Sequence, residues 1–225
     1  MMSMDETTSS QLELHGYHET WEARRPRPLL ICDVDEVVLH LVSPFVTVLD
    51  EMGYGLKTHS FELTGNVFHR ASGEDATQSV VWEGLATLFK EQDTRQHVVD
   101  GVVEALNSLH RDIDIVFLTN LPHEFGDIRR TYLADHGMPY PLVTNTGSKV
   151  SAIERLKDHH EGPVGFIDDT PINLTQVRDA VDDVHLFHFM ADETFRSLAG
   201  EIEGIDFSSG DWAETESHIR RVLLG

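Results

Sequence analysis

Five short apolar runs recur along this chain of 225 residues, and polar or charged positions follow each run. Within a run, apolar side chains do not alternate with polar ones, which is typical of strands buried on both faces of a sheet. The runs cover residues 29–32, 115–118, 141–143, 164–167 and 184–187. The pattern predicts five strands inside one sheet.

Apolar residues at helical spacing occupy most of the intervals between these runs and the last part of the chain. The stretches with this spacing are 99–109, 128–133, 150–156, 172–181 and 211–224. Helices that alternate with fully buried strands are typical of a mainly parallel sheet covered on both faces. We therefore expect an α/β protein with a Rossmann-like sheet and helices on both of its faces.

One long stretch after the first predicted strand breaks this alternation. It opens with a predicted helix over 43–52, passes through turns that contain Gly and His, and returns to helical spacing at Val81, Leu85 and Leu88. A small, mostly helical insertion is expected there. The predicted organisation is a loose polar tail over 1–20, a core formed by 21–40 and 98–225, and the insertion over 41–97.

The charge balance narrows the choice of partners. The chain has 39 Asp and Glu against 17 Lys and Arg, a formal net charge of −22. Nucleic acid and anionic membranes are poor partners for such a surface, because affinity for phosphate polymers depends on basic side chains. No apolar stretch approaches the ~18 residues of a membrane span, and the polar first ten residues do not resemble a secretory signal.

A single cysteine, Cys32, allows no internal disulfide, so the chain carries no sign of an oxidising compartment. Together with the missing membrane span, this predicts a soluble, cytoplasmic protein. The pattern indicates no oligomeric state. The 14 histidines do not change the picture, because they lack the spacing and the Cys partners that are typical of zinc sites.

Polar and charged residues stand where the predicted strands end. Asp33 and Asp35 follow the first strand, Thr119 and Asn120 follow the second, and Lys149 opens the helix before the fourth. Asp168 and Asp169 follow the fourth strand. Ligands of parallel sheets bind at this edge, and clustered carboxylates need a cation to remain ionised together. Mg²⁺ prefers hard oxygen ligands and is typically held by one or two carboxylates and a phosphate.

This set of residues resembles the four motifs of the haloacid dehalogenase-like (HAD) superfamily, in the same order. Residues 33–37 (Asp-Val-Asp-Glu-Val) are similar to the first motif, and 117–120 (Phe-Leu-Thr-Asn) to the second. Lys149 matches the third motif, and 165–169 (Gly-Phe-Ile-Asp-Asp) resemble the paired-acid form of the fourth. Each motif alone is weak, whereas four in order, each beside the expected element, are specific. The resemblance covers about residues 28–190.

The resemblance implies a role for each residue in phosphoryl transfer. Asp33 would attack phosphorus to give an aspartyl-phosphate, and Asp35 would exchange protons with the leaving oxygen and then with water. The remaining implied roles are binding of phosphoryl oxygens by Thr119 and Lys149, substrate binding by Asn120, and binding of Mg²⁺ by Asp33, Asp35 (through its carbonyl), Asp168 and Asp169.

The second acid distinguishes reactions within that superfamily. Members that cleave carbon–halogen bonds lack an acid two places after the nucleophile, so Asp35 favours phosphoryl transfer. The implied activity is a Mg²⁺-dependent phosphatase acting on a small phosphorylated metabolite. A phosphomutase and a non-catalytic HAD-fold module that binds a phosphorylated ligand or a protein are the alternatives. One departure is Glu36, which stands where many members have Gly.

The insertion over 41–97 resembles, in position and size, the small helical cap called C1 in this superfamily. Such caps close over the site and select the substrate. Among its polar residues, Arg70 is the best candidate for binding a second anionic group of the substrate, because its planar guanidinium matches carboxylate or phosphate.

Two motifs also have a purely structural interpretation. Thr119 and Asn120 could cap a helix that begins near Pro122, and Asp168 to Pro171 could form a helix N-terminus with Pro in the first turn. The second interpretation is compatible with metal binding by Asp168.

Overall fold

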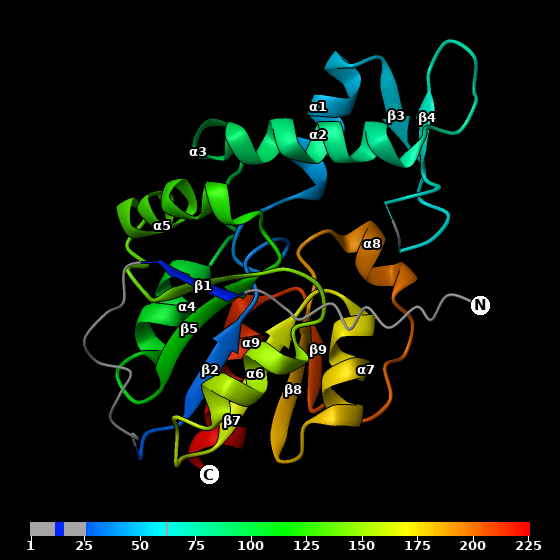
Figure 1. Ribbon diagram of the computed structural model, residues 1–225. Helices are drawn as coiled ribbons and strands as arrows, with labels where there is room; N and C mark the ends of the chain where they lie inside the picture. Colours follow the sequence, from blue (N-terminus) through cyan, green and yellow to red (C-terminus); the bar gives the residue numbers. More distant parts are fainter. Residues whose placement is uncertain (1–11, 16–25, 62) are drawn as a thin grey trace, which may run out of the picture.

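The computed structural model describes residues 12–15, 26–61 and 63–225. A seven-stranded sheet forms its centre, in the order β1-β6-β5-β2-β7-β8-β9 (Figure 1). The strands are β1 (Leu12–His15), β2 (Leu29–Cys32), β5 (Asp114–Thr119), β6 (Leu142–Asn145), β7 (Val164–Asp168), β8 (Val184–Phe189) and β9 (Phe207–Ser209). All neighbouring strands from β6 to β9 pair in parallel, and β1 adds an antiparallel edge.

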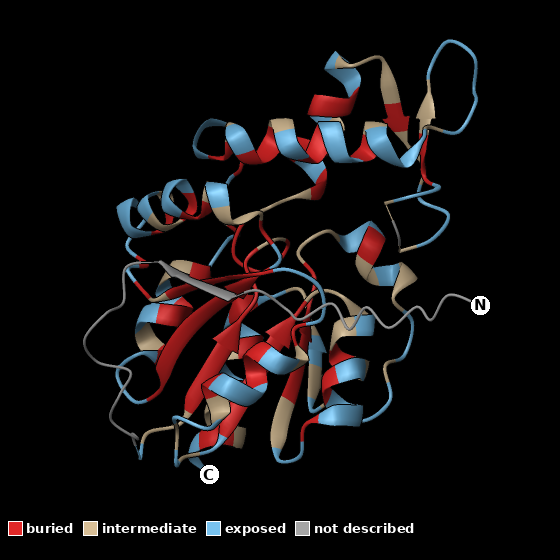
Figure 2. Ribbon diagram, in the orientation of Figure 1, coloured by how far each residue is buried: buried red, intermediate tan, exposed pale blue. Residues whose placement is uncertain are grey.

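The five apolar runs all form strands of this sheet. β2 has the predicted bounds and lies in the middle, with Leu29 paired to Asp114 of β5 and to Val164 of β7. Every residue of β2, β5, β6 and β7 is buried, as Figure 2 shows for the central strands. The prediction of a mainly parallel α/β sheet is confirmed.

Helices cover both faces of the sheet. They are α4 (Val102–Leu109), α5 (Gly126–Asp135), α6 (Val150–Lys157), α7 (Pro171–Ala180) and α9 (Trp212–Leu224). Alternate residues of β2 enter two separate cores: Leu30 packs with Leu106 of α4 and Trp212 of α9, whereas Ile31 packs with Ile153 of α6. Period-two alternation along a strand thus divides the apolar residues of the runs between two layers of helices.

The segment between β2 and α4 forms a separate body above the sheet (Figure 1). It contains α1 (Val42–Glu51), β3 (Tyr54–Leu56), β4 (Val67–His69), α2 (Gln78–Lys90) and α3 (Gln92–Arg95). Phe45 and Leu49 of α1 pack against Leu85 and Leu88 of α2 in a small core, which Leu121 from the loop after β5 also enters. The antiparallel pair β3–β4 was not expected, because three-residue strands are too short to show a period in the sequence.

Two linkers join this insertion to the sheet and lie side by side. The N–H of His40 donates to the carbonyl of His97 at 2.8 Å, and the N–H of Val99 donates to the carbonyl of Val38 at 2.9 Å. We call residues 38–41 and 96–99, which include these pairs, the neck. These two backbone hydrogen bonds hold the entry and the exit of the insertion together where the chain leaves and rejoins the core.

The expected loose tail over 1–20 lies mostly outside the described residues. The prediction is wrong for Leu12–His15, which form β1 and pair antiparallel with β6. Four residues in a polar context give little periodic signal, and an edge strand is held by backbone hydrogen bonds that any side chain permits. Within the described part of the chain, none of the helices has the length and apolar character needed to span a membrane.

Two shorter elements complete the fold near the carboxyl end of the sheet. A 3₁₀ turn (His123–Phe125) follows β5, and α8 (Glu193–Leu198) follows β8. Asp192 caps α8 through its side chain, which accepts a hydrogen bond from the N–H of Phe195 at 2.9 Å. In Figure 1, α8 lies between α7 and the insertion.

Candidate active site

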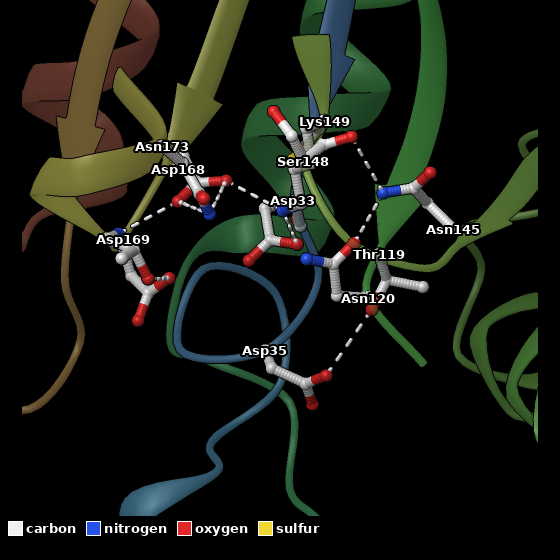
Figure 3. Close-up of polar contacts among 12 residues, drawn as sticks. Asp33, Asp35, Thr119, Asn120, Asn145, Ser148, Lys149, Asp168, Asp169 and Asn173 are labelled. Atoms are coloured by element: carbon white, nitrogen blue, oxygen red, sulfur yellow. Dashed lines mark hydrogen bonds and ion pairs between the residues drawn. The ribbon is translucent and has the colours of Figure 1, made fainter. Parts of the chain in front are cut away.

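Three neighbouring strands bring the polar residues of the sequence motifs to one edge of the sheet. Asp33 follows β2, Thr119 is the last residue of β5, and Asp168 is the last residue of β7. Lys149 immediately precedes α6. Parallel strands end at the same edge, so residues distant in the sequence converge there. Figure 3 shows Asp33 between Asp168 and Asp169 on one side and Asn120 on the other.

The centre of the site is a group of three carboxylates and one ammonium. Oxygens of Asp33, Asp168 and Asp169 lie within 4.8 Å of one another. Nζ of Lys149 lies 2.5 Å from Oδ1 of Asp33 and 2.7 Å from Oδ2 of Asp168. Lys149, Asp33 and Asp168 are buried, and Asp169 is half-buried. We call these four residues the acid cluster.

The acid cluster carries more negative charge than its one lysine balances. Burial, and to a smaller extent neighbouring Asp168, raises the pKa of Asp33 above its usual range, although Lys149 opposes the rise. Burial, Asp168 and Asp33 also raise the pKa of Asp169. Burial by itself would lower the pKa of Lys149, but Asp168 and Asp33 raise it above its ordinary value. A divalent cation among these oxygens would balance the excess.

The donor set fits a hard cation such as Mg²⁺. All three acids offer carboxylate oxygen, the ligand type that Mg²⁺ prefers. Asp168 is oriented by the first turn of α7: its Oδ1 accepts from the N–H of Thr170 at 2.8 Å and from Nδ2 of Asn173 at 3.0 Å. The helix N-terminus predicted for Asp168 to Pro171 is confirmed, since Thr170 precedes the helix and Pro171 opens it.

On the other side of Asp33, amide side chains fix the loops after β5 and β6. Nδ2 of Asn120 donates to the carbonyl of Gly147 at 3.0 Å, and Nδ2 of Asn145 donates to Oδ1 of Asn120 at 2.7 Å. Asn145 also donates to the carbonyl of Ser148, beside Lys149, at 3.3 Å. Asn120 therefore connects the end of β5 to the loop that carries the lysine. The alternative role of Thr119 and Asn120 as a helix cap is not seen, since neither caps the turn at His123.

The side chain of Asp35 is turned away from the acid cluster (Figure 3). Its Oδ1 accepts from Nε2 of Gln96 at 2.9 Å and from Nη1 of Arg129 at 3.1 Å, and its Oδ2 accepts a long 3.4 Å bond from the hydroxyl of Thr119. Arg129, on α5, is fully buried, and it also binds Gln92 and donates to Gln96 at 3.0 Å. Residues of the neck and of α5 thus hold this carboxylate.

Arg70 is not brought to the acid cluster. Its Nε donates to the carbonyl of Tyr54 at 2.9 Å, and its guanidinium forms an ion pair with Asp50. Both partners belong to the insertion. Because the guanidinium of Arg70 is already paired with the Asp50 carboxylate, the geometry does not support Arg70 as the residue that binds a second anionic group of the substrate.

Sequence reasoning missed four residues of the site: Gln96, Arg129, Asn145 and Asn173. Arg129 stands 94 positions from Asp35, and nothing near it in the sequence marks it as buried. Asn173 follows Asp168 by five positions on α7, and this spacing after a motif acid was the one local signal available. Asn145, the last residue of β6, could have been noticed as a polar residue at a strand end.

Glu36 has a structural role that explains the departure from Gly. Its φ is +61°, in the left-handed region that glycine adopts most easily. Its buried carboxylate accepts from the N–H of Leu41 and of Val42, both at 2.6 Å, and from the N–H of Asp192 at 3.0 Å. Glu36 therefore supplies the acceptor for the first turn of α1 and joins the neck to the loop before α8.

We expect Glu36→Ala to lower the free energy of unfolding by at least about 2 kcal/mol, because it leaves three backbone amides without their acceptor. Glu36→Gly loses the same hydrogen bonds, but glycine adopts the positive φ of this position without strain. This variant should therefore be about 1 kcal/mol more stable than Glu36→Ala. Urea denaturation followed by tryptophan fluorescence measures both. Glu83→Ala, an exposed position of α2, is the matched control. Equal stability of Glu36→Ala and wild type would contradict the role assigned to the carboxylate.

The fold has solved counterparts. A HAD-family hydrolase from Deinococcus radiodurans R1, with bound phosphate and sodium, superposes with a TM-score of 0.56 at 14% identity, over 87% of this chain and 96% of that one. A conserved haloacid dehalogenase-like protein of unknown function from Agrobacterium tumefaciens C58 superposes with a TM-score of 0.58 at 15% identity, over 86% of this chain and 98% of that one. A haloacid dehalogenase-like hydrolase family protein from Streptococcus pneumoniae superposes with a TM-score of 0.57 at 11% identity, over 86% of this chain and 98% of that one.

These likenesses show that the chain has the fold of haloacid dehalogenase-like proteins, along nearly the whole length of each of the three. The resemblance inferred from the four motifs therefore holds for the fold. No family model matches the chain, and neither does any curated protein.

Proposed function

We propose that this chain, which has the fold of haloacid dehalogenase-like proteins, is a Mg²⁺-dependent phosphohydrolase that releases inorganic phosphate from a small phosphorylated metabolite. The observation that carries the proposal is the acid cluster: a buried aspartate after the central strand, 2.5 Å from a buried lysine and within 4.8 Å of two further carboxylates. The phosphate bound by the D. radiodurans hydrolase of the same fold supports phosphate as the ligand.

Asp33, Asp168, Asp169 and the backbone carbonyl of Asp35 would hold Mg²⁺ in this proposal. When bound, the ion neutralises negative charge on the phosphoryl oxygens and on the acid cluster. Lys149 supplies a second positive charge at the same place, and the Thr119 hydroxyl a hydrogen bond. These groups stabilise charge that develops on the transferred phosphoryl group, which is the main requirement of phosphoryl transfer.

The reaction has two steps. A carboxylate oxygen of Asp33 attacks phosphorus, the bond from phosphorus to the ester oxygen breaks, and protonated Asp35 gives its proton to that oxygen, so an alcohol leaves. Water then attacks phosphorus and passes a proton to Asp35, while the bond between phosphorus and Asp33 breaks. The products are the alcohol and inorganic phosphate, and both aspartates return to their starting state.

Asp35 has to leave its present partners to perform this transfer. Its carboxylate is bound by Gln96, Arg129 and Thr119, apart from the acid cluster. A rotation of its side chain toward Asp33 would break the bonds to Gln96 and Arg129.

Removal of the metal tests the proposal. We expect chelation by EDTA to lower phosphate release from p-nitrophenyl phosphate by at least about a hundredfold, because charge stabilisation by the metal is worth several kcal/mol in the transition state. Added Mg²⁺ should restore the rate, and EDTA already saturated with Mg²⁺ is the control for effects of the chelator itself.

Two other results would favour the alternatives. Phosphate that is transferred to another position of a sugar phosphate, without release into solution, would indicate a phosphomutase. Absence of metal-dependent turnover over a panel of phosphate esters would reject the hydrolase and favour a phosphate-binding module.

A further inference from the structure

A cavity of about 420 Å³ lies between the insertion and the core, next to the acid cluster. Asp169 and Thr170, after β7, form its border with the cluster. Leu41 and Phe61 contribute from the neck and the insertion, and Ile172 and Phe195 from α7 and α8. Its volume is within the range of about 300–1,000 Å³ that is usual for small-molecule sites.

The lining of this cavity is mostly apolar. Of the thirteen described residues that line it, three are polar (Glu36, Asp169 and Thr170) and ten are apolar. Hydroxyl groups of a sugar would find few partners there, and burying a polar group without a hydrogen bond is unfavourable. Ile172, at the start of α7, has 61% of its surface exposed, although it is a large aliphatic side chain. An apolar ligand in the cavity would cover it.

The charges at the cavity also exclude a second anionic group. No Lys or Arg belongs to the described residues that line it. The carboxylate of Glu36 is taken by three backbone amides, and that of Asp169 belongs to the acid cluster. Arg70, the cation expected for this purpose, is paired with Asp50. A carboxylate or second phosphate of a substrate would therefore find no cation among the described residues that line the cavity.

The cavity is closed on the insertion side by a direct contact with the core. The rings of Phe61 and Phe195 meet edge to face with their centroids 6.2 Å apart. This is a favourable geometry for an aromatic pair, and it joins the loop after β3 to α8. The cavity therefore has apolar residues on its insertion side and on its core side, and Asp169 and Thr170 line it next to the acid cluster.

We propose that this cavity binds the alcohol part of the phosphate ester, and that this part is an apolar aliphatic or aromatic group. The inference rests on the proposed function, because it takes the phosphoryl group to be at Asp33. With the phosphoryl group there, the apolar part of the ester passes Asp169 and Thr170 and packs against Ile172 and Phe195. Phosphorylated sugars and esters with a second anionic group are poor substrates.

A series of monoesters tests this: ethyl, butyl and hexyl phosphate, with glycerol 3-phosphate and glucose 6-phosphate for comparison. Burial of one methylene group strengthens binding by up to about fourfold. The value of kcat/KM should therefore rise at least about tenfold from ethyl to hexyl phosphate, which differ by four methylene groups. Ile172→Ser should reduce the hexyl-to-ethyl ratio of kcat/KM at least about threefold, because it removes apolar surface from the cavity wall. Ile128→Ser, at an exposed isoleucine of α5, is the matched control and should leave the ratio as in wild type.

Calorimetric binding of ethylphosphonate and hexylphosphonate in the presence of Mg²⁺ gives a readout independent of turnover. Metal-dependent hydrolysis without a preference for hexyl phosphate, or with a preference for glucose 6-phosphate, overturns the inference and leaves the proposed function intact. A third outcome is that no ester is hydrolysed, but hexylphosphonate binds more tightly than ethylphosphonate and Ile172→Ser weakens the binding of hexylphosphonate. This outcome supports the apolar binding cavity and rejects the hydrolase. Absence of both effects overturns both.

Discussion

Asp33→Asn is expected to lower the rate of phosphate release by about 10⁴-fold or more and to leave the fold intact. An amide at this position cannot attack phosphorus, and loss of the nucleophile removes the covalent route altogether. The fold should survive because the substitution removes one negative charge from a cluster of three carboxylates with one lysine. Steady-state phosphate release at saturating Mg²⁺ measures the loss.

The control for Asp33→Asn is Asp112→Asn, the same change at an exposed residue that pairs with Arg220 on the far side of the core. It should keep the wild-type rate. Circular dichroism of both variants checks that the fold is retained. If Asp33→Asn keeps more than a tenth of the wild-type activity, another group is the nucleophile.

Lys149→Met is expected to lower the free energy of unfolding of the metal-free protein by about 3–5 kcal/mol, and kcat/KM by about 10³-fold. Nζ of Lys149 is the cation closest to Asp33 and Asp168, and all three residues are buried. Removing one partner of a buried ion pair leaves the other charge without compensation, which is the reason for the large loss of stability. The rate falls because the positive charge that Lys149 places beside the phosphoryl oxygens is missing.

Urea denaturation with and without Mg²⁺ measures this effect and separates it from a packing defect. Mg²⁺ should stabilise Lys149→Met more than wild type, since it replaces part of the missing positive charge and binds only the folded state. Lys90→Met, at an exposed position in the last turn of α2, should change stability by less than about 0.5 kcal/mol. A metal-free Lys149→Met protein as stable as wild type would contradict the proposed balance of charges.

Much of the sheet could be predicted because its strands carry their own signal. Burial on both faces requires continuous apolar runs, and β2, β5 and β7 show them. The acid cluster could be predicted for the same reason: Asp33, Asp168 and Asp169 directly follow such runs, and parallel strands end at one edge. The chain direction and the strand ends together determine where these side chains meet.

The groups that orient the site could not be predicted in this way. Arg129 stands on α5, and its partners Gln92, Gln96 and Asp35 come from distant parts of the chain. A buried arginine is recognised only when its partners are known, because its sequence context resembles that of a surface arginine. Arg70 shows the reverse error: its chemistry suits an anion, but Asp50 on α1 already provides one.

Gln96 links Asp35, the proposed proton donor, to the neck of the insertion. Nε2 of Gln96 donates both to the carbonyl of His40, within the neck, and to the carboxylate of Asp35. A rotation of the insertion that displaces Gln96 would remove one of the three hydrogen bonds that hold the Asp35 side chain away from the acid cluster, and the bonds from Arg129 and Thr119 would remain. If Asp35 is the proton donor, as we propose, a substitution on the insertion that moves Gln96 is expected to change the rate of proton transfer without touching the substrate.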